Sequence, residues 1–248
     1  MRPGTGIVAV VVVMAGGVLT AHAEGKHWSY SKHGGPSEWG ELDQSFASCQ
    51  LGKVQSPIDI RDAKAADLPP IKFDYRASPL KLIDNGHTIQ VSYAPGSSID
   101  VGGTRYELVQ FHFHKPSEEK IAGKAHAMVA HLVHRGPDGS LAVVAVLLDK
   151  GRDNPTLHAV WNNLPKHKDK EISAPVAIDA STLLPTDKGY YTFQGSLTTP
   201  PCSEGVRWFV LKSPMTMANA EISAFAKIYP MNARPSQPLN GRVIEATR

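Results

Sequence analysis

Two histidines, His112 and His114, are separated by a single residue in the segment 108–114. Side chains of a β-strand point to opposite faces with a period of two, so both imidazoles would face the same side of a strand. The residues of opposite parity, which would face a core, are Val109, Phe111 and Phe113. Two neutral imidazoles on one strand face supply half of the ligands of a transition-metal site. Because the chain contains 11 histidines, this spacing alone is weak evidence for a metal.

A third imidazole is available in the next β-compatible segment, 127–134. His131 and His134 have opposite parity there, so only one of them could face a site on the sheet. Three imidazoles with one open position are the composition of a catalytic zinc site, whereas structural zinc is closed by four protein ligands, usually including cysteine. The residues therefore favour a catalytic site, and by themselves they leave the choice between His131 and His134 open.

Short β-compatible segments make up most of the chain and would position these imidazoles. Runs of about four to eight apolar or alternating residues between Gly, Pro, Asn and Asp are typical of strands. The predicted strands are 80–83, 89–93, 108–114, 127–134, 141–148, 190–192 and 206–211. Residues 24–50 show no clean period and are interpreted as an irregular arm, packed on the surface by Trp28, Tyr30 and Trp39. The regular part begins at 55–60.

Two short helices are also predicted. Asn154 followed by Pro155 is typical of an N-cap and a first helical position, and it introduces the helix 156–163. Residues 220–229 carry apolar side chains at helical spacing and stop before Pro230. The chain is therefore predicted to be a mostly-β single domain with small peripheral helices.

Composition limits the possible partners. A chain of 248 residues with 42% hydrophobic content can bury a substantial core. The net charge is only +3 and no long basic run occurs, which argues against nucleic acid or an anionic membrane surface as a partner. The glycine-rich motifs that hold phosphate groups are missing, so a nucleotide is not indicated.

The N-terminus has the features of a secretory signal peptide. Arg2 provides a positive start, 7–19 is uncharged and mostly apolar, and Ala-His-Ala at 21–23 matches a cleavage site. The predicted signal peptide is 1–23, and the mature chain would begin at Glu24. An uncleaved anchor is the alternative, but the apolar run is shorter than the about 20 residues of a transmembrane helix.

The chain has only two cysteines, Cys49 and Cys202. Export would place them in an oxidising compartment, where a disulfide between them is the simplest prediction. The bond would close a loop of about 150 residues, worth up to about 4–5 kcal/mol in the chain-entropy model. Two free buried thiols are the alternative.

Seven motifs occur in order along the chain: 55–60 (QSPIDI), 85–87 (NGH), 110–114 (QFHFH), 117–118 (SE), 130–134 (AHLVH), 195–202 (GSLTTPPC) and 234–240 (RPSQPLN). In this order they resemble the α-class carbonic anhydrases, particularly the bacterial exported ones. The resemblance implies one domain over 24–248 with a twisted central sheet of about ten mainly antiparallel strands. It also implies a zinc ion at the base of a conical cleft.

The resemblance assigns roles to individual residues. The implied zinc ligands are His112, His114 and His131, which decides against His134. Thr198 matches the residue that accepts a hydrogen bond from zinc-bound hydroxide and donates its own proton toward a carboxylate, here Glu118. A hydroxyl has one proton, so an ionised acceptor behind it leaves its lone pairs facing the hydroxide. Thr199 matches a residue that helps to hold bicarbonate. The residues that match the apolar wall for carbon dioxide are Val133, Val143, Leu197, Val206 and Trp208.

A further match concerns proton transfer. His87 corresponds to the proton shuttle of the family, and the ordinary pKa of a histidine, about 6.5, suits transfer in either direction. Tyr30 and Gln90 match polar residues along the water path between the metal and this shuttle. Read without the resemblance, His87 would be an ordinary turn residue after Asn-Gly.

The support behind the ligands departs from the family pattern at one place. Gln110 can accept the free ring N–H of His112, as metal-bound imidazoles usually require. The acidic residue expected two positions before His131 is Val129, and Glu119 stands where the family usually has histidine. We expect either that Glu119 supplies the missing carboxylate from a neighbouring strand, or that His131 is unsupported and Glu119 is solvated.

The implied activity is the zinc-dependent, reversible hydration of carbon dioxide to bicarbonate and a proton, which makes the protein a lyase. The hydroxide that attacks carbon dioxide would also attack activated esters, so a zinc esterase is expected only as a side activity. A non-catalytic carbonic-anhydrase-like domain is the alternative from a different class. The expected partners are small molecules, in a periplasmic or secreted monomer or homodimer that is free of the membrane once the signal peptide is cleaved.

Overall fold

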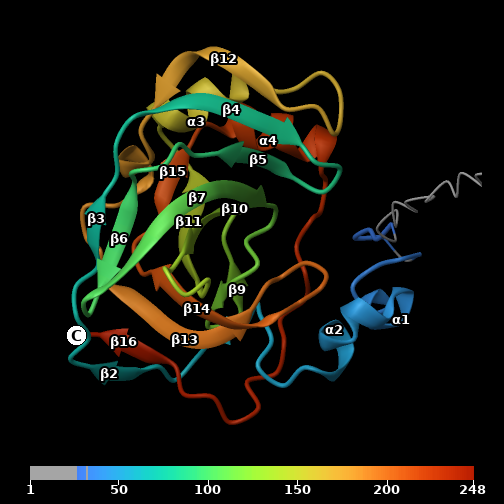
Figure 1. The fold of residues 1–248 in the computed structure, drawn as a ribbon, viewed down its shortest axis with the longest axis vertical. Helices are drawn as coiled ribbons and strands as arrows, with labels where there is room; N and C mark the ends of the chain where they lie inside the picture. The colour runs from blue at the N-terminus through green and yellow to red at the C-terminus, as the bar shows by residue number, and fades with distance from the viewer. Residues whose placement is uncertain (1–26, 32) are drawn as a thin grey trace, which may run out of the picture.

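The computed structural model describes residues 27–31 and 33–248, so the predicted signal peptide at 1–23 lies outside the described residues. The sheet of 13 strands that dominates this part of the chain is large, twisted and mixed (Figure 1). Its strands are β2 (Lys64–Ala66), β3 (Lys72–Asp74), β4 (Ser78–Asp84), β5 (Ile89–Ser92), β6 (Ser98–Val101), β7 (Thr104–His114), β10 (Met128–Arg135), β11 (Leu141–Lys150), β12 (Ile172–Ile178), β13 (Tyr190–Ser196), β14 (Glu204–Leu211), β15 (Met215–Met217) and β16 (Glu245–Thr247). The predicted mostly-β architecture with small helices is confirmed.

The strand order places the two histidine-bearing segments side by side. The sheet runs β12-β4-β5-β7-β10-β11-β14-β13-β16-β2, with β6 and β15 pairing from the side and β3 following β6. β5, β7, β10 and β11 are antiparallel neighbours, whereas β11 pairs with β14 in parallel. A separate small sheet contains β1 (Asp59–Ile60), β8 (Lys120–Ile121) and β9 (Lys124–Ala125).

One side-chain direction in β7 differs from the prediction. Phe111 and Phe113 are fully buried, but Val109 is 37% exposed while Leu108 is buried. The pairing with β10 is irregular at this point, because Val133 faces Gln110 and the next residue of β10 faces Leu108. Val109 is therefore the extra residue of a β-bulge, and a bulge reverses the alternation of the residues that precede it.

The two faces of the sheet carry different clusters of buried side chains. Phe111, Phe113 and Leu132 belong to the larger cluster, which also contains buried side chains of the helices Pro155–Trp161 and Asn219–Ile228. Val129 and Trp208 belong to the second cluster on the opposite face. His131 has the same parity as Val129, so the imidazoles project from the face that carries the smaller cluster.

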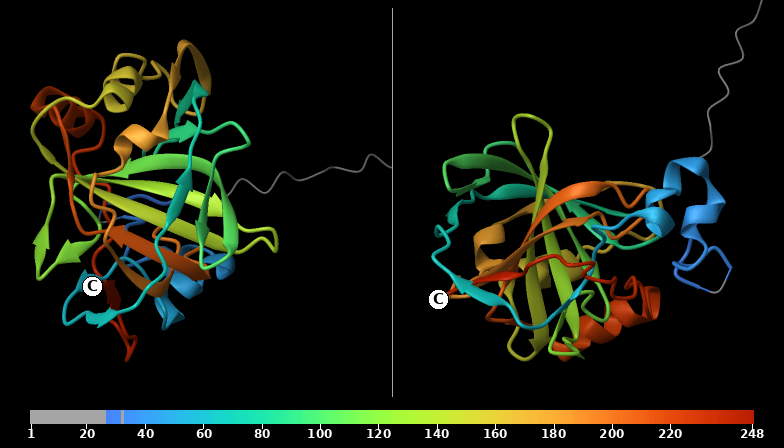
Figure 2. Two further views of the ribbon diagram at one scale, coloured as in Figure 1. Left: turned by 90° about the vertical axis from the view of Figure 1, so that its left-hand side faces the viewer. Right: turned by 90° about the horizontal axis from the view of Figure 1, so that it is seen from below.

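Four α-helices lie at the periphery of the described fold: α1 (Trp39–Leu42), α2 (Ser48–Leu51), α3 (Pro155–Trp161) and α4 (Asn219–Ile228). Two 3-10 helices, η1 (Gln44–Phe46) and η2 (Ala180–Leu183), complete them. As predicted, the Asn154 side chain caps α3 by accepting hydrogen bonds from the Thr156 and Leu157 amides. α3 and α4 lie together near β12, whereas α1 and α2 lie on the other side of the molecule (Figures 1 and 2). None of the described helices is long and apolar enough to cross a membrane.

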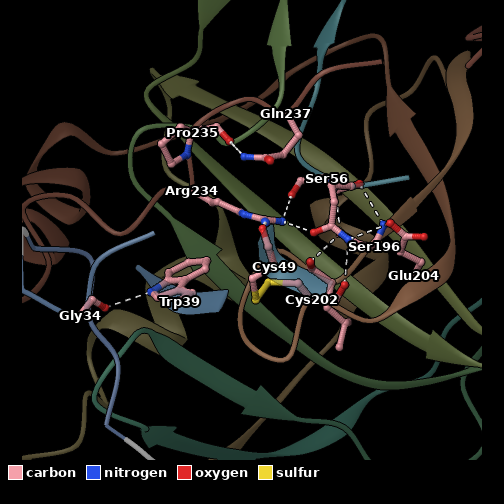
Figure 3. The surroundings of a disulfide bond; sticks show 12 residues. Gly34, Trp39, Cys49, Ser56, Ser196, Cys202, Glu204, Arg234, Pro235 and Gln237 are labelled. Atoms are coloured by element: carbon pink, nitrogen blue, oxygen red, sulfur yellow. Dashed lines mark hydrogen bonds between the residues drawn. A yellow bond between two sulfur atoms is a disulfide. The ribbon is translucent and has the colours of Figure 1, made fainter. Parts of the chain in front are cut away.

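The N-terminal arm is more regular than predicted, since it contains α1, η1 and α2. Its aromatic side chains pack as expected: the Trp28 and Tyr30 rings lie edge-on to the ring of Trp39, which is fully buried. The predicted disulfide is present and joins Cys49 of α2 to Cys202, with the two Cα atoms 5.0 Å apart (Figure 3).

The disulfide lies beside a buried arginine that ties the arm to the body of the protein. The Arg234 guanidinium donates hydrogen bonds to the backbone oxygens of Cys49 and Ser56, at 2.9 and 2.7 Å (Figure 3). It also lies 5.7 Å from the ring centroid of Trp39. The backbone amide of Cys202 donates to the carbonyl oxygen of Thr199, so the disulfide also anchors the turn that follows β13.

Candidate metal centre

Three imidazoles converge between β7 and β10. In the register of the two strands, His131 lies directly opposite His112, and His114 lies two residues further along β7. One ring nitrogen of each histidine lies within 4.8 Å of the other two. His134, on the opposite face of β10, instead contacts the hydroxyl of Tyr75 at 2.8 Å. The sheet therefore brings together the three predicted ligands and separates His134 from them.

The rings of His112 and His114 are both held by an acceptor behind them. His112 Nδ1 donates to Gln110 Oε1 at 2.9 Å, as predicted, and His114 Nδ1 donates to the backbone oxygen of Asn232 at 2.8 Å. These hydrogen bonds fix the tautomer and leave each Nε2 free to bind a metal. His114 Nε2 is buried and has no hydrogen-bond partner among the described residues.

His131 is supported by a carboxylate. Its Nε2 is 3.1 Å from both oxygens of Glu119, whose side chain is fully buried. Glu119 lies in the bend just before β8, not in a strand as predicted, and Val129 packs in the apolar cluster. This contact leaves His131 Nδ1 facing the other two imidazoles. The geometry favours the expectation that Glu119 replaces the carboxylate missing at position 129.

Burial sets the charge of the three rings. Desolvation, together with the nearby His131, lowers the pKa of His112 to about 3, and it also lowers the pKa of His114 well below its usual range. Both imidazoles are therefore neutral, which a metal ligand must be. Desolvation acts in the same direction on His131, but the charge and hydrogen bond of Glu119 outweigh it and raise the pKa of His131.

Two neutral rings, a third ring backed by a carboxylate, and an unpartnered buried nitrogen fit a zinc ion with three protein ligands. Imidazole nitrogens are the usual ligands of catalytic zinc, and a fourth position stays open for water or substrate. The donor set contains no thiolate, since both cysteines are in the disulfide. The residues present therefore fit the group that the sequence predicts.

The three histidines form the floor of a cavity of ≈ 240 Å³. Four of the five residues predicted to form the apolar wall line it: Val133, Val143, Leu197 and Trp208. Val206 belongs to the same apolar cluster but does not line the cavity. Tyr30, Gln90, Thr198 and Thr199 also line the cavity.

Glu118 lies behind the imidazoles and is almost completely buried. Its Oε1 accepts a hydrogen bond from the Arg234 backbone amide at 2.7 Å, and its Oε2 is 3.9 Å from His131 Nδ1. Desolvation raises the pKa of Glu118 to about 7, helped by the charge of Glu119, while His131, the Thr198 hydroxyl and the Arg234 amide act to lower it. Thr198 and Glu118 are thus close enough to interact, although no hydrogen bond of standard length and angle joins their side chains.

His87 lines the same cavity as the three imidazoles. Its ring stacks on Trp28, with centroids 3.6 Å apart and planes inclined by 6°. Desolvation and the nearby His27 lower the pKa of His87, partly offset by Asp169. The residue predicted as the shuttle therefore lines the same cavity as the imidazoles, and its ring packs on an aromatic side chain of the N-terminal arm.

Comparison with known proteins agrees with this geometry. The family model described as eukaryotic-type carbonic anhydrase matches residues 34–248. The chain belongs to this carbonic anhydrase family. A carbonic anhydrase of Pectobacterium carotovorum is 45% identical over 221 residues, which cover 88% of this chain and 90% of that protein. A carbonic anhydrase of Nostoc sp. is also 45% identical, over 91% of this chain and 88% of that protein.

Solved carbonic anhydrase structures share the whole fold. A hyperthermostable carbonic anhydrase from a hydrothermal vent chimney superposes with a TM-score of 0.87 at 47% identity, covering 90% of this chain and all of that one. The α-carbonic anhydrase of Thermovibrio ammonificans, solved with sulfanilamide, gives a TM-score of 0.86 at 42% identity, over 89% of this chain and 99% of that one. Dioscorin, solved with ascorbate, shares the fold at 31% identity and a TM-score of 0.83, covering 90% of this chain and 98% of that one.

Sequence reasoning missed two residues that hold the site together. Asn232 is fully buried, and its side-chain amide donates to the backbone oxygens of His87 and Phe113 while its own carbonyl supports His114. Arg234 holds Glu118 through its backbone amide. Arg234 is the first residue of the motif 234–240, and this motif was the only sequence signal for its role. A contact made by a backbone amide does not depend on the type of side chain, so residue type cannot predict it.

Proposed function

We propose that this chain catalyses the reversible hydration of carbon dioxide to bicarbonate and a proton. The observation that carries the proposal is a set of three imidazoles, each backed by its own acceptor, at the floor of a cavity with one apolar wall. Membership of the carbonic anhydrase family supports the same reaction. The proposed ligands of the catalytic zinc ion are His112, His114 and His131.

Zinc in this position would supply a Lewis acid that lowers the pKa of a bound water to about 7, a value for which carbonic anhydrase itself is the standard example. Three imidazole ligands suit this role, since an imidazole binds a metal in its uncharged form and leaves the double charge of the ion unneutralised. Glu119 and Gln110 would orient two of these rings and raise their basicity. The remaining residues of the cavity then have to bind carbon dioxide, orient the reacting groups and move protons.

Thr198 and Glu118 are proposed to orient the attacking oxygen. Glu118 is buried, acceptor-only when ionised, and fixed by the Arg234 amide. If the Thr198 hydroxyl donates its single proton to Glu118, only its lone pairs remain to face the metal site. Thr198 could then only accept a hydrogen bond there, and this would restrict the orientation of a water molecule held beside it.

The apolar wall is proposed to hold carbon dioxide beside this oxygen. Carbon dioxide has no hydrogen-bond donor and no net charge, so an apolar surface can bind it without competing with water for polar contacts. The wall residues are Val133, Val143, Leu197 and Trp208, with Val206 packed behind them. Thr199, which lines the same cavity, is proposed to hold bicarbonate.

Each turnover releases a proton, and His87 is proposed to carry it to solvent. The ring lines the same cavity as the three imidazoles, and so do Tyr30 and Gln90, the residues proposed for the water path. An imidazole exchanges protons near neutral pH. Stacking on Trp28 restrains the orientation of this ring.

Export to the periplasm or the exterior, with cleavage after position 23, is proposed on two grounds. The N-terminal sequence has the pattern of a signal peptide, and the Cys49–Cys202 disulfide is of a kind that persists in oxidising compartments. The domain would then cover 24–248. N-terminal sequencing of the exported protein tests this proposal, because a retained Met1 would contradict it.

A pH-indicator assay of carbon dioxide hydration, run with and without a chelator, tests the reaction and the metal together. We expect rapid acidification by the zinc-loaded protein, loss of activity after zinc removal, and recovery when zinc is restored. Stoichiometric zinc without any hydration activity would instead favour a non-catalytic binding domain. Ester hydrolysis measured on the same samples should follow zinc content, and it should be much slower than hydration.

A further inference from the structure

A second group of metal-ligating side chains lies away from the candidate metal centre, where α3 meets α4. It contains Asp153, from the loop between β11 and α3, His158 of α3 and Glu221 of α4. One ligating atom of each lies within 4.8 Å of the other two. His158 Nδ1 is 3.0 Å from Asp153 Oδ2 and 3.7 Å from Glu221 Oε1.

Glu221 brings a buried, unsatisfied oxygen to this group. Its side chain is only 8% exposed, and its Oε2 accepts a hydrogen bond from the Ala218 amide at the start of α4. Its Oε1 is buried and has no hydrogen-bond partner among the described residues, because His158 Nδ1 is too distant. A buried carboxylate oxygen without a partner costs free energy. Because this oxygen is directed toward Asp153 and His158, a cation bound between the three side chains would remove that cost.

The other two side chains are also directed at this point. The backbone amide of Asn154 donates to Asp153 Oδ1 at 2.8 Å, which leaves Oδ2 facing His158. The His158 ring is 57% exposed, so solvent can reach the group from one side. Burial raises the pKa of Glu221, and the charge of Asp153 and the contact between the two carboxyl groups add to this rise, while the Ala218 amide and His158 act to lower it.

We propose that Asp153, His158 and Glu221 form a second metal site that binds zinc or a similar first-row divalent ion. One imidazole and two carboxylates are suitable ligands for such an ion, whereas magnesium and calcium prefer oxygen ligands alone. Zinc–ligand bonds of about 2.0–2.2 Å in a tetrahedron place neighbouring ligand atoms about 3.3–3.6 Å apart. The observed 3.0 and 3.7 Å are close to this spacing, and water would complete the shell on the exposed side.

The ion would add a side-chain link between the β11–α3 loop, α3 and α4, beyond the pairing of β11 with β15, the strand that directly precedes α4. Glu221 is already tied to α3, because Trp161 Nε1 donates to its backbone oxygen at 2.7 Å. The chain continues from α4 into the segment that carries Asn232 and Arg234, which support His114 and Glu118. Metal at this site is therefore expected to stabilise the protein without taking part in the hydration reaction.

Equilibrium dialysis against Zn²⁺, with metal content measured by mass spectrometry, tests the site on protein whose first centre is already loaded. We expect a second equivalent to bind, and both Asp153→Asn and His158→Ala to weaken it by at least about tenfold, as for the loss of one of three ligands. His167→Ala, which removes another exposed imidazole, is the matched control and should leave the affinity unchanged.

Thermal unfolding provides a second readout that does not depend on activity. Zn²⁺ in excess of the first equivalent should raise the Tm of the parent protein and of His167→Ala, but not that of His158→Ala. His158 is largely exposed, so its replacement should leave the fold intact. The proposal is overturned if no second equivalent binds, or if Asp153→Asn and His158→Ala bind it as tightly as the parent protein.

Discussion

Replacing Glu119 by Gln should weaken zinc retention without removing a zinc ligand. The carboxylate has both oxygens 3.1 Å from His131 Nε2 and is fully buried, so the contact is strong and shielded from water. Glutamine can still accept a hydrogen bond, but it removes the negative charge that makes His131 more basic. Losing such an outer partner typically costs about 10–100-fold in metal affinity. That range corresponds to about 1.4–2.8 kcal/mol.

The assay is the rate of zinc loss to a chelator, followed for the parent protein and for Glu119→Gln. Glu245→Gln is the matched control, because Glu245 is exposed and lies in β16, which β11, β14 and β13 separate from β10 in the sheet. Combining Glu119→His with Val129→Glu should restore much of the retention, since a carboxylate at position 129 would project from β10 on the same face as His131. Equal zinc-loss rates in the parent and Glu119→Gln proteins would refute the reasoning and leave His131 unsupported.

Three further predictions concern the proton path, the oriented oxygen and the disulfide. His87→Ala should lower turnover in dilute buffer, added imidazole should restore part of it, and a stopped-flow rate unchanged in weak buffer would contradict the shuttle. A histidine accepts protons only above its pKa; because burial and His27 lower the pKa of His87, its contribution should persist below pH 6.5 and be lost as the pH falls through that lowered pKa. Thr198→Ala should reduce turnover by about 10²-fold or more, the order typical of losing a positioned proton-transfer group, while zinc content stays unchanged. Reducing Cys49–Cys202, which closes a loop with a sequence separation of 153, should lower the free energy of unfolding by about 2–5 kcal/mol in denaturant titrations.

The strand that bears His112 and His114 was predictable, because a period of two is set by local backbone geometry. The direction of Val109 was not, because the bulge arises from the pairing of β7 with β10 and not from β7 alone. For the same reason, parity could show that His131 and His134 face opposite sides, but not which side faces the other imidazoles. The resemblance to a known family supplied that choice.

The supports behind the site were only partly predictable. Gln110 lies two residues before His112 on one strand face, so its contact follows from the same period of two. Glu119 could be suggested because the carboxylate expected at position 129 is missing. Whether its side chain reaches His131, however, depends on the bend before β8. Asn232 acts on His114 through a backbone oxygen from a distant segment, and contacts of this kind are determined by the path of the chain.

The positions of Asn232 and Arg234 also affect when the metal centre can form during synthesis. The three imidazoles lie near the middle of the chain, at positions 112, 114 and 131, whereas the segment that fixes His114 and Glu118 begins at Asn232, about 100 residues later. A nascent chain that emerges from its N-terminus therefore carries all three ligands long before the groups that orient two parts of the site. Tight metal binding therefore requires that the C-terminal segment has packed against His114 and Glu118. A product truncated before this segment would keep all three ligands but lack the contacts that orient His114 and Glu118.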